Sequence, residues 1–170
     1  MSEELPKRYF IWGEPDTGKT LFVNRLAQRM KTGVYTKRCA GSWETYNGEK
    51  VVHIEDLTSD KIQYIKGFLK DWMDYYPFKS RAIYNAKTTE ENEERKVIKE
   101  GEIINPGNYV FIITSRKSPE EIFGELDAYT REKIYNRITT LHFTRESVKK
   151  VKEFNSVNKD LSPEELFETH

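Results

Sequence analysis

The chain has 170 residues, the length of one ordinary domain. Its 28 Lys and Arg residues balance its 28 Asp and Glu residues, so a polyanionic partner must be held by a local cluster of charge rather than by the molecule as a whole. A mean hydropathy of −0.79, the lack of a long apolar run and a single cysteine exclude a membrane-spanning helix and an internal disulfide framework. This profile is typical of an intracellular domain from a reducing compartment.

Strands and helices alternate in the first half of the chain. The β-rich segment Arg8–Trp12 ends at a glycine, as a buried strand does where it enters a loop. Apolar positions at near-helical spacing predict a helix from Thr20 to about Lys31. A second strand follows at Val51–Ile54, and a helix capped by Ser59 is expected over Asp60–Tyr75.

The stretch from Phe78 to Gly107 has the pattern of a long projecting hairpin. Two arms, Phe78–Ala86 and Lys96–Ile104, flank the polar acidic tip Thr88–Glu94. Lys79 and Arg81 are separated by one residue, so both are expected on one face of an extended strand. The basic residues on the two arms are Lys79, Arg81, Lys87, Arg95, Lys96 and Lys99.

The second half of the chain continues the alternation. The segment 105–108 is a turn signal, and the segments that follow it predict a strand at Tyr109–Thr114, a helix beginning near Ser118, a helix at Ala128–Asn136 and a strand at Thr140–Phe143. We divide the chain into a leader at 1–7, one domain at 8–144 and a charged tail at 145–170 that contains a weak helix after Ser162. The expected fold is α/β, with a mainly parallel sheet flanked by helices.

A phosphate-binding loop stands between the first strand and the first helix. The pattern G-x-x-x-x-G-K-[ST] is met by Gly13, Glu14, Pro15, Asp16, Thr17, Gly18, Lys19 and Thr20. Glycines let successive backbone N–H groups point at phosphate oxygens, and the helix N-terminus adds positive dipole. Lys19 is expected to reach the β- and γ-phosphates, and the Thr20 hydroxyl to ligate Mg²⁺.

Two acidic residues close the second strand. Glu55 and Asp56 directly follow Val51–Ile54. In a phosphate-loop enzyme one such acid holds Mg²⁺ through water and the other orients the attacking water. The sequence leaves open which acid takes which role.

Further segments resemble the superfamily 3 helicase domain of replication initiator (Rep) proteins from circovirus-like single-stranded DNA viruses and rolling-circle plasmids. The resemblance covers roughly residues 8–144. It rests on the phosphate loop followed in order by WETYNG (43–48), VVHIED (51–56), DYYPF (74–78), ITSR (113–116) with Pro119, and IYNRIT (134–139).

The resemblance implies an AAA+-like phosphate-loop ATPase that moves on single-stranded DNA as a ring, usually a hexamer, with ATP and Mg²⁺ bound at subunit interfaces. Arg137 matches the arginine finger that reaches the neighbouring subunit's γ-phosphate. Arg116 stands where the family has a sensor asparagine. An amide can both donate and accept hydrogen bonds and so orient water, whereas a guanidinium only donates. We therefore expect either that Arg116 contacts the γ-phosphate or a neighbouring subunit, or that ATP hydrolysis is slow.

In the same family the hairpin lines a central channel and grips the DNA backbone. The resemblance therefore assigns DNA contact to Lys79, Arg81, Lys87, Lys96 and Lys99. In a ring these side chains concentrate positive charge on the axis although each subunit is neutral. The family's nicking endonuclease motif, His-x-His, does not occur, so we do not expect this chain to nick DNA.

Two other classes of function remain open. A small phosphotransferase, such as a nucleoside kinase, fits the length and the phosphate loop but requires an arginine-rich lid, and the G-x-x-G-R lid pattern does not occur. An ATP-binding assembly module with weak turnover is kept open by Arg116. Phosphoryl transfer to a small acceptor by a monomer or dimer would identify the phosphotransferase. ATP-dependent assembly with negligible phosphate release would identify the assembly module.

Overall fold

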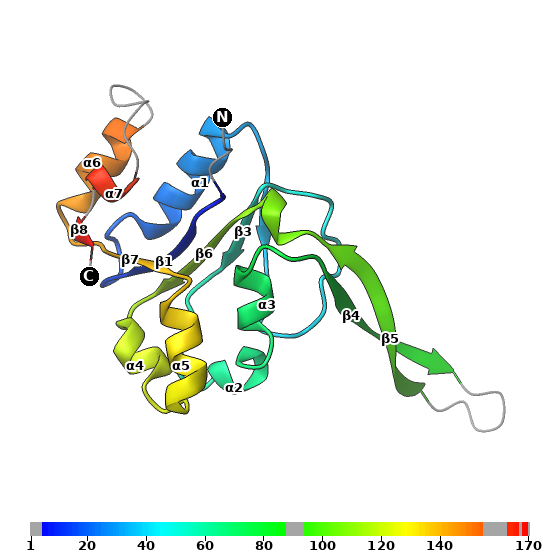
Figure 1. The fold of residues 1–170 in the computed structure, drawn as a ribbon. Coiled ribbons are helices and arrows are strands. Elements are labelled where there is room, and N and C mark those ends of the chain that lie inside the picture. The colour runs from blue at the N-terminus through cyan, green and yellow to red at the C-terminus, as the bar shows by residue number, and fades with distance from the viewer. Residues whose placement is uncertain (1–4, 88–93, 155–162, 167, 170) are drawn as a thin grey trace.

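The protein is built on one twisted sheet. Its structure, a computed structural model, describes residues 5–87, 94–154, 163–166 and 168–169, with the backbone alone at residues 82–87, 94–100, 165–166 and 168–169. Within these residues the sheet has the strand order β2-β3-β6-β1-β7-β8 (Figure 1). Every neighbouring pair up to β7 is parallel, and β8 runs antiparallel to β7. The strands are β1 (Arg8–Trp12), β2 (Val34–Thr36), β3 (Val51–Ile54), β6 (Val110–Ser115), β7 (Thr139–His142) and β8 (Glu168–Thr169).

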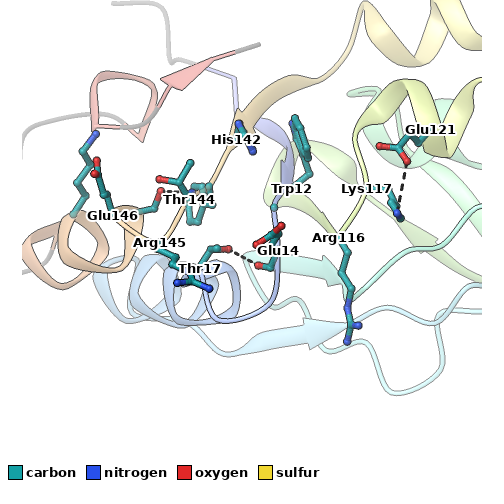
Figure 2. A pocket seen from close by; sticks show the side chains of 14 residues that line it. Trp12, Glu14, Thr17, Arg116, Lys117, Glu121, His142, Thr144, Arg145 and Glu146 are labelled. Atoms are coloured by element: carbon teal, nitrogen blue, oxygen red, sulfur yellow. Dashed lines mark hydrogen bonds and ion pairs between the residues drawn. The ribbon is translucent and has the colours of Figure 1, made fainter.

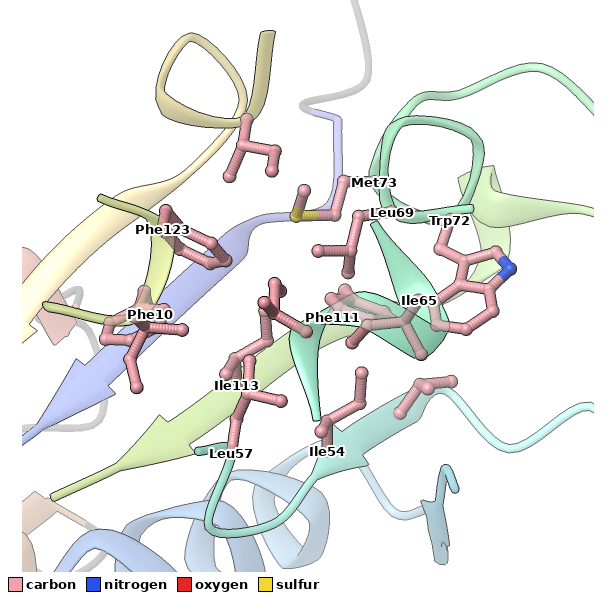
Figure 3. Packing of buried hydrophobic residues seen from close by; sticks show 14 of the residues in the cluster. Phe10, Ile54, Leu57, Ile65, Leu69, Trp72, Met73, Phe111, Ile113 and Phe123 are labelled. Atoms are coloured by element: carbon pink, nitrogen blue, oxygen red, sulfur yellow. The ribbon is translucent and has the colours of Figure 1, made fainter. Parts of the chain in front are cut away.

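Helices cover both faces of the sheet. The apolar side chains of each strand alternate between two cores because successive residues of a strand point to opposite faces. Phe10, Phe111 and Ile113 belong to the core under α2 (Ile62–Ile65), α3 (Leu69–Met73), α4 (Pro119–Phe123) and α5 (Ala128–Tyr135) (Figure 3). Tyr9 and Ile11 belong to the core under α1 (Lys19–Arg29) and α6 (Ser147–Phe154). The predicted α/β class and the mainly parallel sheet are therefore confirmed.

The prediction of a single helix over 60–75 is wrong. The chain forms two short helices, α2 and α3, separated around Gly67, and the first begins after Lys61 without a side-chain cap, so Ser59 does not cap it. Glycine costs about 1 kcal/mol in a helix interior. A break at this point lets both short helices turn their apolar side chains into the same core.

Three short elements were not expected from the sequence. They are β2, β8 and α6, of which β2 has three residues and extends the sheet by pairing Val34 with Val51. Helix α6 lies in the segment assigned to the tail, yet it buries Val151 and Phe154 against the α1 side of the sheet. The weak C-terminal helix is present as α7 (Pro163–Leu166). None of the helices in the described part of the chain is both long and apolar enough to cross a bilayer.

A two-stranded hairpin projects from the body of the molecule. Strands β4 (Phe78–Lys87) and β5 (Glu94–Ile104) pair antiparallel, as the sequence predicted, and the short 3-10 turn Pro106–Asn108 leads from them into β6 (Figure 1). At the rise of an antiparallel strand, ten residues extend by about 30 Å. The predicted acidic tip falls mostly on 88–93, outside the described residues.

A buried arginine joins the start of β1 to the base of this hairpin. Arg8 is 2% exposed, and its guanidinium donates to the backbone carbonyls of Met73, Asp74, Pro106 and Tyr109. The cation also lies 4.4 Å from the ring centroid of Tyr75. Burial lowers the pKa of Arg8, so the carbonyls and rings must hold its charge in place. The C-terminal end of α3 and the turn before β6 are thereby fixed to the strand that leads into the phosphate loop.

We predict that Arg8→Met lowers the free energy of unfolding by about 3 kcal/mol or more, because it leaves several buried carbonyls without a donor. Urea denaturation measures this loss, with Arg38→Met, which removes an exposed arginine, as the matched control. A loss at Arg8 no larger than the loss at Arg38 would contradict the role given to this network.

Candidate functional site

Most of the predicted site residues meet in one cleft. The parallel strands end at the same edge of the sheet, so the loops after β1, β3 and β6 lie side by side. They enclose a cleft of about 350 Å³. Its lining residues are Pro15, Asp16, Thr17, Gly18, Lys19, Thr20, Leu21, Glu55, Asp56, Thr114 and Arg116. The phosphate-loop residues that do not line it are Gly13 and Glu14, which line a neighbouring cavity.

The loop's backbone is set for an anion. Gly18 has a φ of +90°, a conformation that favours glycine, and a Cβ at Gly13 would collide with the carbonyl oxygen of Phe143. The Thr17 hydroxyl donates to the Glu14 carbonyl at 2.8 Å and holds the loop closed. Helix α1 then begins with no side-chain cap and no acidic residue in its first turn. Its N-terminal N–H groups are therefore available to phosphate oxygens.

The Lys19 side chain folds back over the loop. Its ammonium donates to the carbonyls of Gly13 and Glu14, the latter at 2.9 Å. An ammonium has three N–H donors, so these bonds fix its position and leave one for a phosphate oxygen. Burial lowers the pKa of Lys19, an effect that the nearby Asp56 carboxylate opposes.

The acid pair faces the loop from the end of β3. Glu55 and Asp56 are both exposed, and Asp56 has a φ of +54°, which is uncommon for a residue other than glycine. Its carboxylate lies 3.6 Å from Nε of Arg116, a pair in which both side chains are more than half exposed. Such a pair contributes at most about 1 kcal/mol, so an incoming ligand can replace either partner.

A hydroxyl that sequence reasoning had not assigned to the site fixes Asp56. The Thr114 hydroxyl oxygen accepts the N–H of Asp56 at 3.2 Å and lies 2.8 Å from Nε2 of His53. Burial lowers the pKa of His53 to about 4, so this histidine is neutral at pH 7. Thr114 lies in the ITSR segment beside Arg116, and the sequence carries no separate signal for its bond to Asp56.

The donor set of the cleft fits a hard cation. The Thr20 hydroxyl and the two carboxylates supply the oxygen ligands that Mg²⁺ prefers. The described residues contain no group of three or more His, Cys, Asp or Glu side chains placed to hold a metal. A cation in the cleft would therefore complete its shell with phosphate and water oxygens, as Mg²⁺ commonly does.

Arg137 does not line the cleft. Its guanidinium lies 3.2 Å from the Asp74 carboxylate and donates to the Lys133 carbonyl at 2.8 Å, which joins the segment after α5 to the segment before the hairpin. Burial of the Asp74 carboxyl acts to raise its pKa, and hydrogen bonds from the Tyr75 N–H and from Arg137 act to lower it. The hydrogen bonds have the larger combined effect, so the pKa of Asp74 is lower than its usual value. The structure thus holds Arg137 in an ion pair of its own subunit, and its role at a neighbour's nucleotide stays a prediction.

The base of the hairpin presents two of the predicted cations. Lys79 and Arg81 are exposed and Ser80 between them is 8% exposed, which is the expected alternation. Arg81 also lies 5.1 Å from the ring centroid of Phe68. Lys87, Lys96 and Lys99 are placed in the strands by backbone pairing alone, and their side chains lie outside what the structure describes.

Comparison with known proteins gives one family. A family model described as RNA helicase matches residues 9–105, more than half of the chain, including the phosphate loop, the acid pair and the hairpin. No curated protein matches the chain. A solved structure described as that of the YGR205w protein is 11% identical over 96% of this chain and 74% of its own, with a TM-score of 0.27. A likeness that weak carries no argument.

We expect Thr114→Val to lower the turnover of nucleotide hydrolysis about tenfold or more, because the Asp56 N–H loses its acceptor and its carboxylate loses its fixed direction. Nucleotide affinity should change little, since Lys19 and the α1 N-terminus remain. Steady-state phosphate release and equilibrium nucleotide binding separate the two effects.

Thr114→Ser is the matched control, because it keeps the hydroxyl and should restore turnover. Normal turnover in Thr114→Val, or an equal loss in both variants, would show that the hydroxyl does not position Asp56.

Proposed function

The chain belongs to the RNA helicase family, with a domain of the superfamily 3 helicase type, and we propose that it is the ATP-driven motor of a rolling-circle replication initiator, moving on single-stranded DNA. Family membership supports a nucleotide-driven, nucleic-acid-binding helicase domain. The observation that carries the ATP-driven part of the proposal is the cleft in which the phosphate loop, the acid pair and Arg116 converge.

In this proposal the chain's own groups divide the work of hydrolysis. The Lys19 ammonium and the α1 N-terminus bind and orient the β- and γ-phosphates. Thr20 and one of Glu55 and Asp56 would hold Mg²⁺, which would supply positive charge to offset the charge that develops on the phosphates. The other acid accepts a hydrogen bond from the attacking water and orients it toward the γ-phosphate.

Arg116 acts as an exchangeable cation. Its exposed ion pair with Asp56 neutralises the carboxylate while the phosphates are absent. A bound γ-phosphate carries more charge than one carboxylate and attracts the guanidinium away from Asp56. The carboxylate is then free for the metal or the water, which gives Arg116 a function in place of the sensor asparagine.

The hairpin supplies the contact to DNA. Lys79 and Arg81 stand exposed at its base, and the hairpin projects away from the rest of the sheet (Figure 1). Assembly into a hexamer brings the copies of these cations onto one axis, which attracts a phosphate backbone although each subunit is neutral. Lys87, Lys96 and Lys99 lie further along the same two strands.

Ring assembly also gives Arg137 its role. A finger that acts in trans must leave or stretch its ion pair with Asp74 when a neighbouring nucleotide binds. A cation fixed at the transferring phosphate is worth about 10³–10⁵ in rate. Hydrolysis is thereby confined to assembled interfaces and is coupled to the movement of the hairpins.

RNA is the second candidate for the nucleic acid on which the motor moves, because the matched family is described as RNA helicase. The phosphate contacts of the hairpin do not distinguish the two polymers, since both present the same backbone charge. A phosphotransferase or an assembly module would leave the projecting hairpin, with Lys79 and Arg81 exposed at its base, without a function.

We predict that oligodeoxythymidine raises ATP turnover, and that Lys79→Ala/Arg81→Ala lowers this stimulation by at least about threefold, because two phosphate contacts per subunit are lost. Phosphate release is measured with and without the oligonucleotide at low salt, with oligouridine as a parallel arm. Lys66→Ala/Lys70→Ala removes two exposed cations from the α2–α3 segment and is the matched control. Turnover insensitive to both oligonucleotides would contradict the proposal.

The trans role of Arg137 predicts complementation. Lys19→Ala and Arg137→Ala should each be inactive alone, and mixed subunits should regain part of the activity, because a Lys19→Ala subunit can donate its Arg137 to an intact phosphate loop next to it. Phosphate release from the mixture is compared with the mean of the separate variants.

Asp74→Asn is the matched control for Arg137, because it breaks the ion pair and keeps the guanidinium. The trans role would be contradicted if the mixture were no more active than the mean of the two variants and Asp74→Asn were as inactive as Arg137→Ala. Arg137 would then act only through its ion pair with Asp74, as a structural residue.

A further inference from the structure

A second cavity opens on the other side of the phosphate loop. Its volume is about 820 Å³, and its lining comes from the start of the loop, from the segment that follows β7 and from the segment after β6 (Figure 2). The segments after β6 and β7 lie beyond residue 105, where the match to the family model ends. Apart from the phosphate loop and Arg116, sequence reasoning had assigned no function to these residues.

The two cavities meet across the loop. Thr17 and Arg116 line both of them, whereas Gly13 and Glu14 face the larger cavity and Lys19 and Thr20 the smaller cleft. Ligand sites commonly have volumes of about 300–1,000 Å³, so the 350 Å³ cleft is at the lower limit for a whole nucleoside triphosphate. The phosphate chain bound in the cleft would lead its nucleoside into the larger cavity.

A pair of stacked rings lines this cavity. Trp12 and His142 lie with ring centroids 3.9 Å apart and planes 12° apart, at the paired ends of β1 and β7. Both side chains are labelled in the wall of the cavity in Figure 2. Nucleobases stack on flat aromatic side chains, and each such contact contributes about 1–3 kcal/mol to binding.

Polar groups lie beside these rings at the start of α6. Arg145, Glu146 and Lys150 line the cavity with exposed side chains. Their charged ends match the hydroxyl groups of a ribose and the first phosphate of the chain. The cavity therefore combines a flat apolar surface with hydrogen-bonding groups, as a nucleoside requires.

The wall is held rigidly against the phosphate loop. The Phe143 N–H donates to the Trp12 carbonyl at 2.8 Å, and Thr144 and Ser147 exchange hydrogen bonds of 2.8 and 2.9 Å that start α6. Phe143 and Phe154 both pack on Phe22 of α1, with ring centroids 5.7 and 5.6 Å apart. The cavity wall and the phosphate-binding helix thus share one core.

We propose that this cavity is the nucleoside subsite, in which the base lies against the Trp12–His142 pair and the ribose beside the turn at 144–147. The inference rests on the proposed function, because it takes the smaller cleft as the place of the triphosphate. It adds residues 142–147 and Lys150 to the nucleotide-binding residues and gives the start of α6 a function besides packing.

The test compares a ligand that has a base with one that has none. Magnesium tripolyphosphate presents the phosphates alone, and magnesium ATP adds the nucleoside. His142→Ala should weaken ATP binding about tenfold, which corresponds to about 1.4 kcal/mol, and should leave tripolyphosphate binding within about twofold. His142→Phe keeps a flat ring and should restore ATP binding. Isothermal titration calorimetry measures each dissociation constant.

A second variant covers a failure of His142→Ala to fold. Thr144→Trp places a bulky ring in an exposed turn of the cavity wall and should likewise weaken ATP binding and spare tripolyphosphate. Tyr64→Ala, which changes an exposed tyrosine outside both cavities, is the matched control. Equal losses for both ligands, or no loss for either, would overturn the nucleoside subsite. Failure of the unmodified protein to bind tripolyphosphate or ATP would instead overturn the proposed function, and the inference with it.

Discussion

The common direction of the strands is the constraint on which the site depends. Because β1, β3, β6 and β7 run parallel in adjacent positions, their carboxyl ends meet at one edge and bring together loops that are far apart in the chain. The phosphate loop, the acid pair, Arg116 and the His142–Ser147 turn all lie at this edge. An antiparallel neighbour at any of these positions would have sent one of these groups to the opposite side of the molecule.

Sequence patterns within single segments were sufficient to predict much of this arrangement. The phosphate loop, Glu55 and Asp56 could be placed because a short apolar strand followed by a special loop is visible in the sequence, and the hairpin because two arms flank a polar tip. The break at Gly67 was missed because apolar residues continue at helical spacing on both sides of it. Strand β2 was missed because a three-residue strand owes its formation to pairing with β3, which no local pattern records.

Contacts between distant segments were beyond the reach of the sequence. Thr114 supports Asp56 only because β3 and β6 are neighbours. The stacked pair of Trp12 and His142 exists because β1 and β7 are adjacent, although 130 positions separate the two residues. Helix α6 is rich in charge and therefore has the composition of a solvated tail, although Val151 and Phe154 are buried in the core under α1. Candidate groups were therefore predictable, and their partners were not.

The chain's neutral charge and its proposed partner are compatible if DNA contacts a local cluster of cations, and Lys79 and Arg81 form such a cluster at the exposed base of the hairpin. Cation contact with a phosphate backbone depends on local density rather than on the sum over the molecule. In the proposed function, nucleotide chemistry takes place at the sheet edge and DNA contact takes place on the hairpin. Arg8 joins the two regions, since it links the strand that carries the phosphate loop to the segments on either side of the hairpin.

Particle mass in solution, measured with and without ATP and oligodeoxythymidine, tests the central claim most directly. Energy coupling at subunit interfaces predicts a closed oligomer of defined mass when both ligands are present, and phosphate release that rises with the fraction assembled. A particle that keeps the mass of one 20.1 kDa chain under every condition while it hydrolyses ATP at full rate would contradict the account.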